Sequence, residues 1–167
     1  MSPISRSLYY VSLFCTFLSL IVHGASFAGR DFPQALFLVP LLFIIWPMTV
    51  WQWRRIPHRN LVSEVFVTIP LWMKLAAGFC LLYPFINYFV CGSVNDGGLP
   101  VQLADGRLVL QRGQQIIREL DAAGFSRARA VETRMLSGHL LAFYGVAVIT
   151  LRALWLKSST AAADIYR

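Results

Sequence analysis

Charged residues are scarce in this chain. Of its 167 residues only 14% are charged, whereas 57% are hydrophobic, and the mean hydropathy is +0.59. A soluble domain typically has about 25% charged and about 45–50% apolar residues. So large an excess of apolar side chains cannot be buried in one core of this size, so lipid must solvate part of it. The sequence therefore predicts a membrane protein with a single domain, residues 1–167.

Acidic residues are the rarer of the two charged classes. Eight Asp and Glu residues stand against 15 Lys and Arg residues, a formal charge of +7. A basic balance can indicate nucleic-acid binding, but these cations lie beside apolar runs and form no known nucleic-acid-binding motif. Topology signals and phospholipid headgroups account for them. We expect the lipid bilayer, and no nucleic acid, as a partner.

Cysteine and catalytic motifs are also sparse. Cys15, Cys80 and Cys91 all lie in apolar runs, without a CxxC or a Cys/His pair at zinc spacing, which is typical of buried free thiols. No GxSxG, HExxH, P-loop or GxGxxG sequence occurs. Ser137 and His139 are too close along one helix to face each other as a nucleophile and base. We expect no enzymatic activity, no catalytic residue, no metal and no cofactor.

Long apolar runs predict an all-α membrane protein with four transmembrane helices. About 20 residues at 1.5 Å per residue cross a hydrocarbon core of about 30 Å. The expected spans are residues 8–28, 32–53, 70–92 and 135–156. The first run exceeds the hydrophobic region of a signal peptide, about 7–15 residues, and is interpreted as a retained helix.

Two features qualify these spans. In the second span, Pro40 and Pro47 predict bends that neighbouring helices can tolerate. Between spans two and three, residues 56–69 fit either a connecting loop or a short helix lying in the membrane interface.

Polar residues in the first span share one helical face. Ser12, Thr16, Ser19 and His23 recur at intervals of four, three and four residues. In lipid such a face is expected to turn toward other helices.

The one long polar segment, residues 93–134, predicts an external element. Asp105-Gly106 stands between two short strand-like runs, which indicates a β-hairpin with a two-residue loop. An isolated hairpin is marginally stable, so we expect it to pack on residues 114–120 and on the start of the last helix. That helix is expected to begin with Asp121 or Ser126 as N-cap and to continue into the fourth span.

The distribution of Lys and Arg gives an orientation. With four spans, both termini and the Arg54–Arg59 loop share one side, and this side carries most of the cations next to the spans. We therefore expect cytoplasmic termini, an external (periplasmic) 93–134 element and a location in a bacterial inner membrane.

Three polar residues fall at one predicted depth, about 6–8 Å below the outer surface. They are His23, Asn87 and His139, with Ser137 beside them. Three interpretations stay open for this polar layer. The side chains hydrogen-bond and fix helix packing; His23 and His139 hold a haem or transition metal; or the two histidines are a protonatable pair on a transport or quinone-access path.

The chain from Tyr83 to Tyr144 resembles a family of small uncharacterised bacterial inner-membrane proteins with about four spans. The matching residues are Tyr83-Pro-Phe-Ile-Asn87, Gly97-Gly98-x-Pro100, Asp105-Gly106-Arg107, Leu110, Arg112-Gly113, Ile117-Arg118-Glu119, Arg134-x-x-Ser137-Gly138-His139 and Phe143-Tyr144. The sequence departs from the family pattern at Arg112, Phe125 and Leu140, where His, Tyr and Trp are expected. The resemblance implies the four-span architecture and the hairpin, and implies no activity.

These observations predict a non-enzymatic membrane protein, an accessory or assembly subunit that binds a protein partner, or a second copy of itself, through the external element. The hairpin residues expected to matter are Gly97, Gly98, Pro100, Asp105, Gly106, Arg118 and Glu119. Gly138, Ala142 and Gly145 form a small-residue stripe for close helix packing. The alternative function is a bis-histidine haem protein or a proton-linked transporter that uses His23 and His139.

Overall fold

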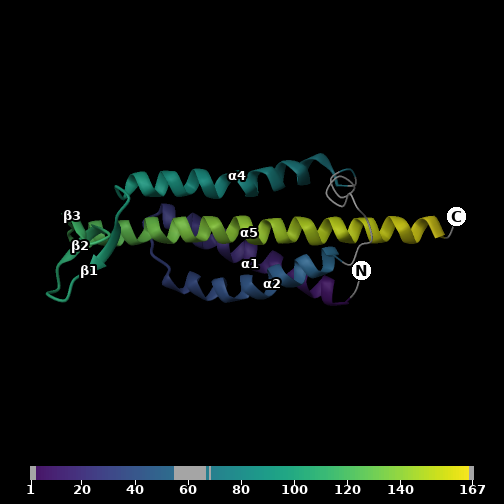
Figure 1. Cartoon of the computed structure of the whole chain (residues 1–167), viewed down its shortest axis with the longest axis horizontal. Helices are drawn as coiled ribbons and strands as arrows, with labels where there is room; N and C mark the ends of the chain where they lie inside the picture. Colours follow the sequence, from purple (N-terminus) through teal and green to yellow (C-terminus); the bar gives the residue numbers. More distant parts are fainter. Residues whose placement is uncertain (1–2, 55–66, 68, 166–167) are drawn as a thin grey trace.

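The computed structural model of the chain describes residues 3–54, 67 and 69–165. Its helices are α1 (Pro3–Phe27), the 3-10 helix η1 (Pro33–Phe37), α2 (Leu38–Arg54), α4 (Leu71–Val94) and α5 (Ala122–Ile165). Its strands are β1 (Leu99–Gln102), β2 (Leu108–Arg112) and β3 (Gln115–Glu119). In Figure 1 the sheet lies at one end of an elongated bundle, and both chain ends lie toward the other.

Four helical segments of the described chain are long and apolar enough to cross a membrane: 3–27, 33–54, 71–94 and 122–157. The prediction of a mostly helical chain with four such segments is therefore confirmed. The interpretation of residues 56–69 falls almost entirely outside the described residues.

Helix α5 runs through the middle of the bundle, and α1 packs along it (Figure 1). The buried positions of both helices repeat every three or four residues, the heptad spacing of a coiled-coil seam. On α5 they are Ala130, Thr133, Ser137, Leu140, Tyr144, Ala147 and Leu151. On α1 they are Ser5, Leu8, Ser12, Cys15, Ser19, His23 and Ser26. Serine at every seventh position of α1 permits a close approach of the two helices. The polar face of α1 therefore turns inward, as predicted.

One buried hydroxyl links α5 to the start of α2. The Tyr144 side chain is fully buried, and its hydroxyl donates to the Leu38 carbonyl at 2.5 Å. Tyr144→Phe removes this bond and leaves the carbonyl without that donor, so we expect a loss of about 1 kcal/mol in the free energy of unfolding. Thermal unfolding in detergent measures the loss. Tyr10→Phe, at a residue that is 54% exposed on α1, is the matched control and is expected to have little effect.

The second apolar segment of spanning length is not an α-helix throughout. Its first five residues form η1, and the α-helix begins only at Leu38. Pro40 explains the difference, because it lacks the N–H that would bond the Leu36 carbonyl in an α-helix. The tighter 3-10 turn avoids that missing bond.

The polar segment predicted to be external contains a three-stranded antiparallel sheet in the order β1-β2-β3. The predicted hairpin is its β1–β2 half, and the segment expected to pack on the hairpin forms β3. The prediction of a two-residue Asp-Gly loop is wrong. Gly106 N–H bonds the Leu103 carbonyl, Leu103 N–H bonds the Arg107 carbonyl, and Gly106 has φ +88°. These features define a three-residue loop that ends in a left-handed glycine.

Helix α5 begins directly after Asp121, one of the two residues predicted as its N-cap. The Asp121 carboxylate accepts the Gly124 N–H at 2.7 Å, as an N-cap does. Ser126 lies inside the helix instead. The helix has 44 residues, a length of about 66 Å at 1.5 Å per residue, so it extends farther past the expected fourth span than the sequence indicated.

Candidate functional site

Three of the four predicted polar-layer residues lie together between α1, α4 and α5. His23 Nδ1 lies 3.0 Å from Ser137 Oγ, and His23 Nε2 is hydrogen-bonded to the Tyr83 hydroxyl. Asn87 donates its amide to the Arg134 carbonyl at 3.1 Å. His23 and Asn87 are each 5% exposed, and Ser137 is fully buried. We call His23, Tyr83, Asn87 and Ser137 the histidine cluster.

The hydrogen bonds around His23 form a chain in which each group donates to the next, from the Tyr83 hydroxyl to the Thr133 carbonyl. Ser137 Oγ lies 2.7 Å from the Thr133 carbonyl, which can only accept, so the hydroxyl donates there. Ser137 therefore accepts from His23 Nδ1–H, and the unprotonated Nε2 accepts from the Tyr83 hydroxyl. Both ring nitrogens are occupied, and the chain ends at a backbone carbonyl that cannot pass on a proton. This arrangement suits helix packing better than metal ligation or proton transfer.

Ser137 and His23, both members of the predicted polar layer, form a serine–histidine pair from different helices. A nucleophile needs access to its substrate. The Ser137 side chain is fully buried, so the pair has no exposed reactive oxygen.

At Gly138, α5 lies close to both α1 and α4. A Cβ built on it meets the Asn87 side chain of α4, with Cγ at 3.1 Å, and the His23 Cε1 of α1 at 3.3 Å. Two turns later, a Cβ on Gly145 lies 2.7 Å from the Cys80 sulfur of α4. Ala142, between them, is 5% exposed. The predicted stripe of small residues thus faces α4 and, at Gly138, also α1.

Arg134 borders the histidine cluster. Its guanidinium lies 4.0 Å from the centre of the Phe27 ring, and its Nη2 donates to the Ser26 carbonyl at 3.3 Å. Both contacts tie α5 to the end of α1 next to the external element. Stacking on an aromatic face is favourable for a guanidinium in a partly buried place.

His139 does not join the cluster. Its Nδ1 lies 2.7 Å from the Met135 carbonyl, within its own helix. Its ring faces Tyr88, with ring centres 6.4 Å apart. The structure therefore gives His23 and His139 separate partners and brings them to no common site.

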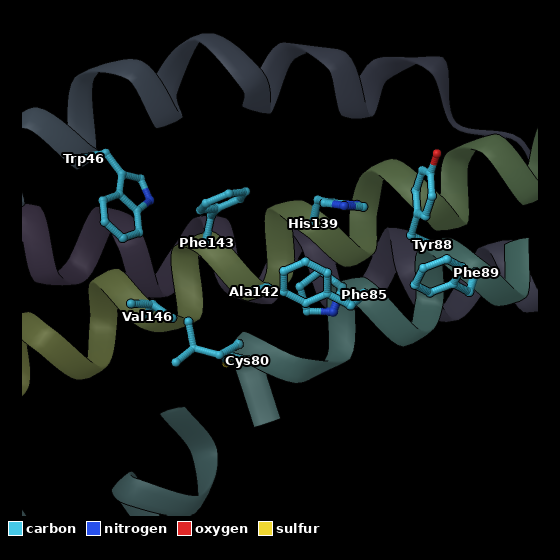
Figure 2. A pocket seen from close by; sticks show the side chains of 11 residues that line it. Trp46, Cys80, Phe85, Tyr88, Phe89, His139, Ala142, Phe143 and Val146 are labelled. Atoms are coloured by element: carbon cyan, nitrogen blue, oxygen red, sulfur yellow. The ribbon is translucent and has the colours of Figure 1, made fainter. Parts of the chain in front are cut away.

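His139 instead lines a cavity of about 580 Å³ between α2, α4 and α5, which we call the aromatic cavity. Figure 2 shows the rings of Trp46, Phe143, His139 and Tyr88 in a row along it. The lining residues are Trp46, Cys80, Leu81, Pro84, Phe85, Tyr88, Phe89, His139, Ala142, Phe143 and Val146.

In the three-stranded sheet, Arg107 holds the hairpin loop to the third strand. Its guanidinium lies 2.8 Å from both the Asp105 and the Glu119 carboxylates. The hydrogen bond from Arg107 lowers the pKa of the Asp105 carboxyl below its usual value. Arg107 thus bridges Asp105 and Glu119, two of the predicted hairpin residues. Among the sequence predictions, Arg107 appeared only as part of the Asp105-Gly106-Arg107 motif.

Two glycines fix the start of β1. A Cβ on Gly98 meets Ile117 Cδ1 at 2.7 Å and Leu110 Cγ at 2.9 Å, so a larger residue would have to displace these side chains. Gly97 has φ +67° and lies against the Arg112 guanidinium, which bonds the Asp96 carbonyl. Pro100, the next predicted residue, is buried on β1.

A second cavity, of about 500 Å³, separates the end of β3 from the first turns of α5; we call it the strand–helix groove. Arg118 and Glu119 line it from the strand, and Gly124 and Arg127 from the helix. Arg118 has a long contact of 3.9 Å with Asp96, and Arg127 is exposed.

Tyr83 and Trp46 are among the site residues that sequence reasoning missed. Tyr83, Asn87 and Cys91 recur every four residues on α4, so they share a face. The Cys91 thiol also donates to Asn87 Oδ1 at 3.6 Å. That periodicity was available in the sequence. Trp46 offered no such signal, because it fits an interfacial aromatic belt equally well.

No family model, curated protein or solved structure matches the chain. The resemblance to small bacterial inner-membrane proteins therefore stays a prediction.

Proposed function

We propose that the chain is a multi-pass inner-membrane protein of bacterial type, without enzymatic activity, that binds a partner protein through its external element, residues 93–134. Four apolar helices of spanning length support the membrane location. Both chain ends lie toward the end of the bundle away from the sheet (Figure 1). Arg6, Arg54 and Lys157 belong to that end, which favours cytoplasmic termini and an external sheet.

The free edge of β3 carries the partner-binding proposal. Within the described residues β3 pairs with β2 alone, so its outer edge offers unpaired backbone groups. Such an edge can accept an extended peptide as an additional strand. Ile116 on this strand is 40% exposed, although it is apolar. The proposed occupant is therefore an extended segment of a partner protein, laid along β3.

The adjoining strand–helix groove favours a segment with an acidic side chain. Glu119 already binds Arg107, and Asp121 caps α5, so both carboxylates of the groove have partners. Its two arginines, Arg118 and Arg127, are exposed. A carboxylate from the partner would complement them through charge-assisted hydrogen bonds.

The decisive experiment combines cross-linking with variants of the two sheet edges. A photo-reactive amino acid at Gln115 in cells is expected to give one discrete cross-linked product, and mild extraction should give a stoichiometric complex. Ile116→Asp with Arg118→Glu should weaken that complex at least tenfold, because apolar contact and charge complementarity are both lost. Reassembly from the two purified proteins provides the measurement.

Leu99→Asp is the matched control. Leu99 is 53% exposed and lies on β1, at the other edge of the sheet. The complex should keep its affinity in this variant. Equal loss in both variants would point to damage of the sheet, and a chain that gives no cross-link at Gln115 would exclude partner binding at β3.

The histidine-based alternative has weaker support. A shared axial pair needs two free imidazole nitrogens near one another, whereas both nitrogens of His23 are hydrogen-bonded and His139 faces the aromatic cavity.

A further inference from the structure

The aromatic cavity has the size and lining of a binding site for a small apolar molecule. Its volume of about 580 Å³ falls within the range of about 300–1,000 Å³ typical of ligand pockets. Five of its lining residues are aromatic besides His139, and none of the eleven is charged. A charged ligand would find no counter-ion there, so the cavity selects a neutral molecule.

The rims of the cavity are apolar and exposed. On α4, Leu81, Phe85 and Phe89 are 61%, 66% and 69% exposed. Within the membrane spans such side chains face acyl chains, because an exposed apolar surface of this extent is disfavoured in water. A ligand therefore enters sideways from the bilayer.

The row of rings is braced at one end. Trp46 and Phe143 meet edge to face with ring centres 5.8 Å apart, and the nitrogen edge of Trp46 is turned toward Phe143 (Figure 2). The indole N–H is buried and has no hydrogen-bond partner among the described residues. The Trp46 indole thus shapes one end of the cavity.

His139 places a hydrogen-bond acceptor in the cavity. Its Nδ1 faces the Met135 carbonyl at 2.7 Å, and a carbonyl only accepts, so Nδ1 carries the proton. In the neutral ring Nε2 is then unprotonated and acts as an acceptor. The ligand that matches this site presents an O–H donor to Nε2.

We propose that the aromatic cavity binds a neutral, lipid-soluble phenol, of the kind represented by a prenylated hydroquinone, whose hydroxyl donates to His139 Nε2. The aromatic head of such a molecule packs edge to face against Phe143 and Tyr88, as those rings already pack on Trp46 and His139. Its isoprenoid tail follows the apolar rim of α4 into the bilayer. This site is separate from the external element and does not depend on partner binding there.

The test uses the whole chain in phosphatidylcholine nanodiscs and a farnesylated phenol with a diazirine in its tail. Irradiation should label residues in the stretches 80–89 and 139–146. Unlabelled farnesylphenol should compete at a concentration about fivefold to tenfold lower than its methyl ether, because the ether lacks the donor and loses one net hydrogen bond. This comparison needs no variant.

Three variants test whether the phenol binds in the aromatic cavity. His139→Phe keeps a flat ring and removes the acceptor, so phenol and ether should then compete equally. Val146→Phe narrows the cavity and should reduce labelling severalfold. Leu82→Phe, next to the lining residue Leu81 but outside the cavity and 61% exposed, should leave labelling unchanged.

Equal competition by phenol and ether in the unsubstituted chain would show that the groove holds acyl chains alone, and would overturn the proposal. So would a preference for phenol that survives in His139→Phe, or a chain left unlabelled because a second copy covers this face. Thermal unfolding of each variant confirms that the fold is intact.

Discussion

Replacing Gly138 with leucine is expected to prevent the four helices from assembling into a stable bundle. The position lies where α5 meets α1 and α4, and even a Cβ there touches the Asn87 side chain and His23 Cε1. Overpacking a well-filled site typically costs about 1–3 kcal/mol. We expect Gly138→Ala to fall in that range and Gly138→Leu to exceed it, because the isobutyl group also displaces the Asn87 bond to Arg134.

Thermal unfolding and size-exclusion profiles in detergent measure these losses. Gly78 on α4 is the matched control, since a Cβ there has no neighbour within 4 Å. Gly78→Ala is expected to raise stability by about 0.5–1 kcal/mol, the usual gain of alanine over glycine inside a helix. Combining Gly138→Ala with Asn87→Ser should recover part of the loss, because the shorter side chain vacates the contact. Identical effects at the two glycines would refute the close approach at Gly138.

The helical framework could be predicted because its signal is strong. Runs of about 20 apolar residues have few structural outcomes in a membrane protein, and Asp121 before a long proline-free stretch is a typical cap. The external sheet was recognised only in part. The Gln115–Glu119 strand is almost wholly exposed, so it has no alternation of buried and exposed residues by which a strand is recognised.

The polar layer shows that the depth of a residue along its helix does not by itself predict which side chains meet. A rise of 1.5 Å per residue places His23, Asn87 and His139 at one level, but it does not state which way each side chain points. Ser137 and His139 are two residues apart, a rotation of roughly 200° about the helix axis. Ser137 faces His23, so His139 must face away, and it lines the aromatic cavity. The rotation follows from helix geometry alone. The direction in which His139 points could be predicted only once Ser137 was known to face α1, and the packed helices show that contact.

The two histidines should therefore differ sharply in their effect on stability. His23→Leu removes the acceptor of the Tyr83 hydroxyl and the donor to Ser137, both inside the bundle. Leaving a buried polar group unpaired costs about 1–3 kcal/mol, so we expect a loss of about 2–4 kcal/mol in the free energy of unfolding. His139→Leu removes only a bond to the Met135 carbonyl in its own helix, and a loss below about 1 kcal/mol is expected.

Tyr83→Phe distinguishes the loss of the His23 hydrogen-bond network from a loss of side-chain volume. This variant removes the hydroxyl that donates to His23 Nε2, so combining it with His23→Leu should cost less than the sum of the two single losses. Chemical denaturation of all four proteins in one detergent gives the coupling free energy, for which we expect about 0.5–3 kcal/mol, the usual value for residues in one hydrogen-bond network. A coupling near zero would mean that Tyr83 and His23 stabilise the bundle independently. A loss at His139 as large as that at His23 would mean that the aromatic cavity, and not the histidine cluster, holds the helices together.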